Sequence, residues 1–216
     1  MTLAELIAGF RDVATASVAD AVDKVAGRTG FLNQSIKPRI NDKKICGPAV
    51  TILEGPTQEF LPPQHALDAI DEADEGSVIV ISVNSEENVA VWGGLMTAGA
   101  VANKHEAAIL DGAVRDLVEI KRDYDFPVFA RSVSPGTTLG RFKTIASNVE
   151  VPIGEVMINP GDIVVGDVDG VVVVPREHAE EVLRMSQEID EREAEQAKLI
   201  IQNGSLREGL AKYGRI

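Results

Sequence analysis

Apolar side chains at helical spacing mark the start of the chain. Between residues 3 and 26 they recur three or four positions apart, which predicts amphipathic helix, at Leu3, Leu6, Phe10, Val13, Val18, Ala21, Val22 and Val25. Ser17 interrupts this pattern. A serine is a favoured N-cap residue, so a second helix is expected to start near Val18.

Short apolar runs alternate with helical segments in the middle of the chain. Strands are predicted at 47–53, 77–83, 107–110 and 127–130, and helices at 64–75, 93–104 and 114–122. The run 77–83 is apolar almost throughout, which is typical of a strand covered on both faces. Alternating strands and helices predict parallel strands joined by right-handed crossovers, and therefore an α/β fold.

The second half changes character. Residues 131–176 form short β segments separated by turns, and 163–165 and 171–174 flank Asp167-Val168-Asp169-Gly170 as a hairpin. This tetrapeptide has part of a calcium-loop pattern, but without the remaining ligand spacing it favours a plain turn. Residues 177–202 predict an acidic amphipathic helix, and 205–213 a short final helix. No linker-like segment interrupts the chain, so residues 1–216 are expected to form a single domain.

The charge of the chain limits its partners. It has 34 acidic and 21 basic residues, a net charge of −13. This balance argues against nucleic acid and against an anionic membrane surface as direct ligands. Neither a signal peptide nor an apolar run long enough to span a bilayer is recognisable. The single cysteine, Cys46, is expected to be buried and inert, which suits a reducing cytoplasm.

Two segments carry candidate chemistry at the carboxyl ends of predicted strands, where open parallel sheets bind ligands. Trp92-Gly93-Gly94-Leu95-Met96 offers bare amides at a helix N-terminus, which suit a small carboxylate. Asp111 to Asp116 ends in Arg115, a fork for carboxylate or enolate oxygens, and Asp116, a hard ligand for Mg²⁺ or Mn²⁺. Adjacent strands would bring both segments to one rim, as a site for a metal-chelated 2-oxo acid. The structural alternative is a Gly-Gly turn and a surface Arg-Asp pair.

No other set of residues makes a comparable site. His65, His105 and His178 are far apart in the sequence and lack the spacing of zinc ligands. No G-x-S-x-G elbow is present, so an α/β-hydrolase triad has no support.

The two rim motifs together strongly resemble the RraA-like family, which includes the class II 4-hydroxy-4-methyl-2-oxoglutarate/4-carboxy-4-hydroxy-2-oxoadipate aldolases. The likeness runs through most of the chain, in the segments 17–21, 37–38, 47–51, 159–162 and 167–172. It implies a β/β/α sandwich similar to the swivelling phosphohistidine domain, with flanking N- and C-terminal helices. It also implies trimers or hexamers with active sites between subunits.

The resemblance implies roles for the rim residues as well. The backbone amides that hold the pyruvyl carboxylate would be those of Gly93, Gly94, Leu95 and Met96. Arg115 would bind the 2-oxo oxygen and stabilise the enolate, and Asp116 would coordinate the divalent metal. A carboxylate from a neighbouring subunit's C-terminal helix would join the metal, with Glu191, Glu193 and Glu195 as the alternatives.

One departure from the family affects the expected reaction. Aldolase members have an acidic residue, which orients the water proposed as base, where this chain has Gly94. The sequence therefore predicts a metal-dependent lyase that decarboxylates oxaloacetate through a metal-held enolate but cleaves aldol substrates poorly. Asp111, Glu86 or Glu87 could replace the base. The alternative is a non-catalytic regulator that binds ribonuclease E, although the family's regulators depart at the Arg-Asp pair that this chain keeps.

Overall fold

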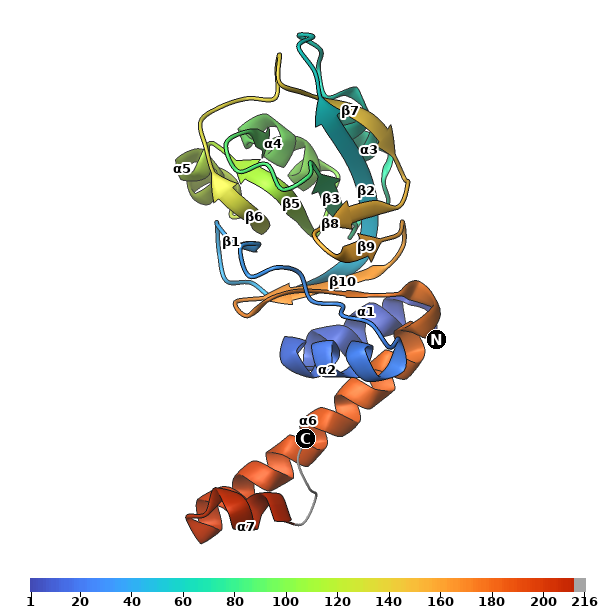
Figure 1. Cartoon of the computed structure of the whole chain (residues 1–216), viewed down its shortest axis with the longest axis vertical. Helices are drawn as coiled ribbons and strands as arrows, with labels where there is room; N and C mark the ends of the chain where they lie inside the picture. Colours follow the sequence, from blue (N-terminus) through green and yellow to red (C-terminus); the bar gives the residue numbers. More distant parts are fainter. Residues whose placement is uncertain (212–216) are drawn as a thin grey trace.

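The computed structural model describes residues 1–211, which are organised around one large mixed β-sheet (Figure 1). Its strands lie in the order β1-β6-β5-β3-β2-β10-β11, with β4 paired to β5 and β7 paired to β2. Their bounds are β1 Lys37–Pro38, β2 Ile45–Pro56, β3 Val78–Ser82, β4 Ala90–Trp92, β5 Ala107–Val114, β6 Val128–Val133, β7 Phe142–Ser147, β10 Ile163–Asp167 and β11 Gly170–Val174. A separate antiparallel pair joins β8 (Val151–Ile153) to β9 (Val156–Ile158).

The central strands β2, β3, β5 and β6 are parallel, as the alternating sequence pattern predicts. Every residue of β3 and β5 is buried. One face packs against α3 (Gln64–Glu72) and α4 (Gly94–Ala102) through alanines such as Ala66 and Ala100. The opposite face packs against β8 and β9. Two covered faces account for the unbroken apolar character of these strands.

The terminal helices form a layer of their own below the β10–β11 hairpin (Figure 1). This layer contains α1 (Leu3–Asp12), α2 (Thr15–Val25) and the first part of α6 (Ala179–Asn203), packed on Val172 and Val174. The expected start of the second helix near Val18 is wrong, because α2 begins at Thr15. Asp190 of α6 accepts hydrogen bonds from the Ala14 amide and the Ser17 hydroxyl, so the cap comes from another helix.

Strand β5 runs four residues further than predicted, to Val114. The expected turn at Asp111-Gly112 is wrong, because both residues are buried within the strand. The pairing with β6 shifts by one residue between Leu110 and Ala113, which marks a β-bulge on β5. Only a short helix follows, α5 (Leu117–Glu119), continued by a π-helical turn at Ile120–Tyr124.

The far half of α6 extends away from the sheet, and α7 (Leu206–Ala211) folds back on it (Figure 1). A 3-10 turn, Arg176–His178, leads into α6. Residues 212–213 of the predicted last helix lie outside the described residues. The hairpin, the long C-terminal helix and the α/β class are confirmed. None of the helices within residues 1–211 is long and apolar enough to cross a membrane.

Candidate active site where β4 and β5 end

The two candidate segments meet side by side, as expected from adjacent strands. The short strand β4, which the sequence pattern did not predict, pairs with β5 and leads into α4. The Arg115 amide donates a 3.0 Å hydrogen bond to the carbonyl of Trp92. The Thr97 hydroxyl accepts from the Trp92 indole at 2.8 Å and donates to the Gly93 carbonyl at 3.0 Å. These bonds fix the entry into α4.

Gly93 and Gly94 allow the Arg-Asp pair to approach the helix N-terminus. A Cβ atom on Gly93 would lie 2.7 Å from Asp116 Oδ2 and 3.1 Å from Arg115 Nε. The Gly94 amide donates to Asp116 Oδ2 at 3.0 Å. Within residues 1–211, no acceptor bonds the amides of Leu95 and Met96. Two amides at the start of α4 are thus available to a ligand carboxylate.

Arg115 and Asp116 form a loose pair that water reaches. Arg115 Nε lies 3.5 Å from Asp116 Oδ2, and the side chains are 43% and 39% exposed. Asp116 has a φ of 61°, a left-handed conformation that an aspartate adopts at some energetic cost. This backbone turns its carboxylate back to Gly94. The guanidinium and the carboxylate can therefore both contact a ligand held at α4.

Glu119 is a third candidate at this place, and the sequence analysis missed it. A Cβ atom on Gly94 would lie 2.8 Å from the Glu119 carboxyl carbon. The carboxylate of Glu119 thus occupies the space that a side chain at position 94 would enter. Its position three residues after Asp116 was the available signal, because it places Glu119 in the first turn of the helix that follows the Arg-Asp motif.

Arg115 and Asp116 line two neighbouring cavities. The first, of about 310 Å³, is also lined by residues 93–96 and by residues of the β6–β7 connection. The second, of about 580 Å³, includes Glu119 and residues 133–135. A ligand on the Arg-Asp pair can therefore contact both the α4 amides and the Glu119 side of the site.

The three carboxylates named as replacement bases do not join this site. Asp111 is buried in an ion pair with Arg131 and accepts a 2.7 Å hydrogen bond from the Ser85 amide. Glu86 accepts a 2.6 Å hydrogen bond from the Asn88 amide in the loop after β3. Neither Glu86 nor Glu87 is among the residues that line the two cavities. Glu119 is the carboxylate that lies beside Gly94, where the aldolase members have their acidic residue.

The carboxylate oxygens at this site suit a divalent cation that keeps part of its water shell. They do not form a site in which protein ligands enclose the metal. Asp116 and Glu119 line one cavity and provide hard oxygen donors. In the part of the chain that the structure describes, no three His, Cys, Asp or Glu side chains come together as metal ligands. Mg²⁺ keeps several waters and needs only one or two protein carboxylates, so Asp116 with bound water suffices. Glu191, Glu193 and Glu195 lie on the far half of α6.

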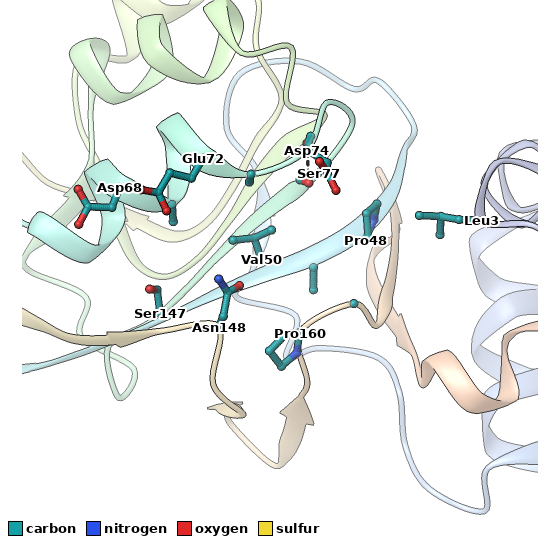
Figure 2. Close-up of a pocket in the computed structure, with 14 residues that line it drawn as sticks. Leu3, Pro48, Val50, Asp68, Glu72, Asp74, Ser77, Ser147, Asn148 and Pro160 are labelled. Carbon is teal, nitrogen blue, oxygen red and sulfur yellow. Dashed lines mark hydrogen bonds between the residues drawn. The ribbon is translucent and has the colours of Figure 1, made fainter.

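A further cavity, of about 410 Å³, has the wrong charge for an anionic substrate (Figure 2). Asp68, Glu72 and Asp74 line it, without a lysine, arginine or histidine among the lining residues. Cys46 is buried, as predicted, and burial raises the pKa of its thiol to about 12. The two cavities lined by Arg115 and Asp116 therefore remain the candidate active site.

Comparison with known proteins shows the family of the chain. A family model described as Aldolase/RraA, RraA-like, matches residues 15–173. The chain belongs to the RraA-like family. A Halalkalibacterium halodurans protein, provisionally named a 4-hydroxy-4-methyl-2-oxoglutarate aldolase, is 34% identical over 83% of this chain and 81% of its own length.

Two further comparisons extend this picture. Protein DlpA of Legionella pneumophila is 35% identical over 94% of this chain, which spans only 33% of DlpA. The crystal structure of RraAS2 from Streptomyces coelicolor, described as an unusual member of the RNase ES inhibitor RraA protein family, superimposes with a TM-score of 0.81. The superposition covers 88% of this chain and 95% of RraAS2. At 24% sequence identity it shows that the two proteins share a fold.

Proposed function

We propose that this RraA-like protein is a divalent-metal-dependent lyase that releases pyruvate from 2-oxo acids by aldol cleavage, by oxaloacetate decarboxylation, or by both. The observation that carries the proposal is the gathering of Arg115, Asp116 and Glu119 against Gly93 and Gly94. The aldolase names of relatives at about a third identity support the same reaction class.

The α4 N-terminus and Arg115 hold the pyruvyl part of the substrate. The amides of Leu95 and Met96 donate to its carboxylate, which the helix dipole also favours. The Arg115 guanidinium donates to the 2-oxo oxygen. Negative charge grows on that oxygen when the C3–C4 bond breaks, so Arg115 binds the transition state more tightly than the ground state.

The electrons of the C3–C4 bond move in the same direction in both reactions. In aldol cleavage the C4 hydroxyl gives up its proton, C4 becomes a carbonyl, and the bonding pair enters the enolate of pyruvate. In decarboxylation the C4 carboxylate leaves as CO₂ and the same enolate results. Protonation at C3 then gives pyruvate in each case.

Only aldol cleavage needs a base at the C4 hydroxyl. Glu119 supports this role, because its carboxylate occupies the space beside Gly94. We assign it the C4 hydroxyl proton, taken directly or through one water. This assignment revises the sequence-based expectation that aldol cleavage is poor.

Asp116 would hold Mg²⁺ or Mn²⁺ together with water molecules. When bound, the cation supplies positive charge that stabilises the enolate. The strained backbone of Asp116 is the kind of local cost found at functional sites. A protein-binding regulator has no need of the Arg115–Asp116 geometry, and we therefore favour the lyase over the regulator hypothesis.

Chelation and one substitution test the proposal. Pyruvate release from oxaloacetate should stop in EDTA and return with Mg²⁺ or Mn²⁺. Arg115→Lys should lose roughly 10²–10³ in kcat, because a point charge replaces a planar fork. Arg184→Lys, on the exposed side of α6, is the matched control and should keep full activity. Undiminished turnover in excess chelator, or an Arg115→Lys enzyme within a few-fold of wild type, would contradict the proposal.

A further inference from the structure

The C4 side of a bound substrate lies toward the larger of the two cavities. In the proposed reaction the α4 amides hold the pyruvyl carboxylate, Arg115 holds the 2-oxo oxygen, and Glu119 takes the proton of the C4 hydroxyl. Glu119 lines the 580 Å³ cavity but not the 310 Å³ cavity. Groups attached to C4 therefore enter the 580 Å³ cavity, and its lining decides which of them are accepted.

This cavity has a second guanidinium, that of Arg122. Its other charged lining residues are Arg115, Asp116 and Glu119, and the remaining lining consists of a serine and apolar residues. The 2-oxo oxygen uses Arg115, the metal uses Asp116, and the hydroxyl proton uses Glu119. Arg122 is thus the charged residue of this cavity that the reaction has not yet used.

Arg122 lies in the π-helical turn Ile120–Tyr124. Such turns are rare and recur at functional sites. Its side chain is 68% exposed, and Nε and Nη2 donate hydrogen bonds to Asp123 at 2.6 and 2.5 Å. These bonds raise the pKa of Arg122, and the charge of Glu119 adds to this effect. A guanidinium has five N–H donors, so Arg122 keeps donors for a ligand.

We propose, on the basis of the lyase function above, that Arg122 is a specificity-determining residue that binds a carboxylate on the C4 side of the substrate. In a 4-hydroxy-2-oxo acid this carboxylate is a substituent of C4 and stays on the product that leaves with pyruvate. In oxaloacetate it is the group that departs as CO₂. Arg122 then stabilises a charge that the reaction must remove, so it contributes to KM and not to kcat.

The reverse aldol reaction isolates this contact. Pyruvate loses a C3 proton, C3 bonds to the carbonyl carbon of an acceptor aldehyde, and the resulting alkoxide takes up a proton. Glyoxylate and 2-methylpropanal are offered to the Mg²⁺-loaded full chain at saturating pyruvate, because the two have the same branched shape and differ in the carboxylate. Hydrogen exchange at pyruvate C3 in D₂O is followed by NMR in parallel, since this exchange requires no acceptor.

The ratio of kcat/KM for glyoxylate to that for 2-methylpropanal reports on Arg122. Arg122→Gln should lower this ratio about tenfold, the lower end for a hydrogen bond to a charged group, and Arg122→Lys should restore part of it. Asp123→Asn should raise the ratio, because the guanidinium loses its competing partner. Lys121→Gln removes the same charge from a neighbour that lines neither cavity and should leave the ratio unchanged. With oxaloacetate, Arg122→Gln should raise KM about tenfold and keep kcat.

The outcomes separate this inference from the function on which it rests. Normal exchange at C3 with an unchanged ratio in Arg122→Gln overturns the role of Arg122 alone. An equal loss in Lys121→Gln also overturns it, because surface charge in general would then attract the anionic acceptor. Absence of exchange in the metal-loaded wild type overturns the lyase function, and the role of Arg122 with it.

Discussion

The lack of side chains at Gly93 and Gly94 leaves room for neighbouring functional groups. Gly93 has an extended backbone that any residue could adopt, with a φ of −159°. The restriction is steric, since Asp116, Arg115 and Glu119 occupy the space around the two glycines. A larger residue at either position would have to displace the groups that we assign to the chemistry.

Exchanging the carboxylate between positions 94 and 119 tests the role of Glu119. Glu119→Gln should lower aldol cleavage about 10²-fold, the usual scale of a lost general base, and leave oxaloacetate decarboxylation near wild type. Gly94→Asp alone should gain nothing, because the Glu119 carboxylate already occupies that space. Gly94→Asp combined with Glu119→Ala should recover part of the aldol activity. The measurement is pyruvate release from both substrates.

Equal losses of the two activities in Glu119→Gln would show that Glu119 serves binding or folding and is not the base. Glu208→Gln, an exposed change on α7, is the control and should affect neither reaction.

Strand β2 carries a buried carboxyl group, that of Glu54, where it pairs with β7. Glu54 lies on β2 opposite Thr144 of β7, is only 4% exposed, and neither of its oxygens has a hydrogen-bond partner within residues 1–211. Burial raises the pKa of Glu54 to about 7. The segments that follow Glu54 and precede Thr144 reach Pro62 and Leu139 of the 310 Å³ cavity.

The raised pKa of Glu54 predicts a pH-dependent stability. Because the folded state favours the protonated carboxyl, the free energy of unfolding should fall between about pH 4.5 and pH 7 and level off above, by about 3 kcal/mol at most. Glu54→Gln removes this titration. Urea unfolding at pH 5 and pH 8 should therefore show the variant gaining on wild type at pH 8. A difference that stays constant with pH would mean that Glu54 does not titrate in this range.

On the scale of the whole molecule, the far half of α6 and α7 form an arm that leaves the sheet (Figure 1). This arm packs mainly on itself and exposes Ile201 and Leu206, which are 80% and 62% accessible. Apolar groups on a projecting helix favour a partner surface. The arm supports the proposal of a homo-oligomer, in which Glu191, Glu193 or Glu195 could approach a neighbouring site.

Light scattering tests the assembly. The wild type should have three or six times the 23.1 kDa mass of the chain at micromolar concentration. Ile201→Lys combined with Leu206→Lys should lower that mass, because charges on the arm weaken an apolar contact. A wild-type mass of 23.1 kDa would contradict the assembly and would exclude a neighbour's carboxylate from the site.

The sequence by itself determined the features that depend on local pattern. Apolar runs of strand length predicted β2, β3 and β6, and turn residues with flanking valines predicted the β10–β11 hairpin. The Arg115–Asp116 motif and the double glycine indicated the rim of the sheet. Each of these signals is contained in a few consecutive residues, so it can be recognised without the rest of the chain.

Only the tertiary structure decided where distant groups meet. Asp111 is buried in β5 as the ion-pair partner of Arg131 on β6, and the Ala14 amide before α2 donates to Asp190, far along the chain. Glu119 is part of the candidate site because the turn after β5 brings its carboxylate against Gly94, which belongs to another segment. Space, desolvation and charge pairing act between residues that are adjacent only in the folded chain, and local sequence patterns do not record them.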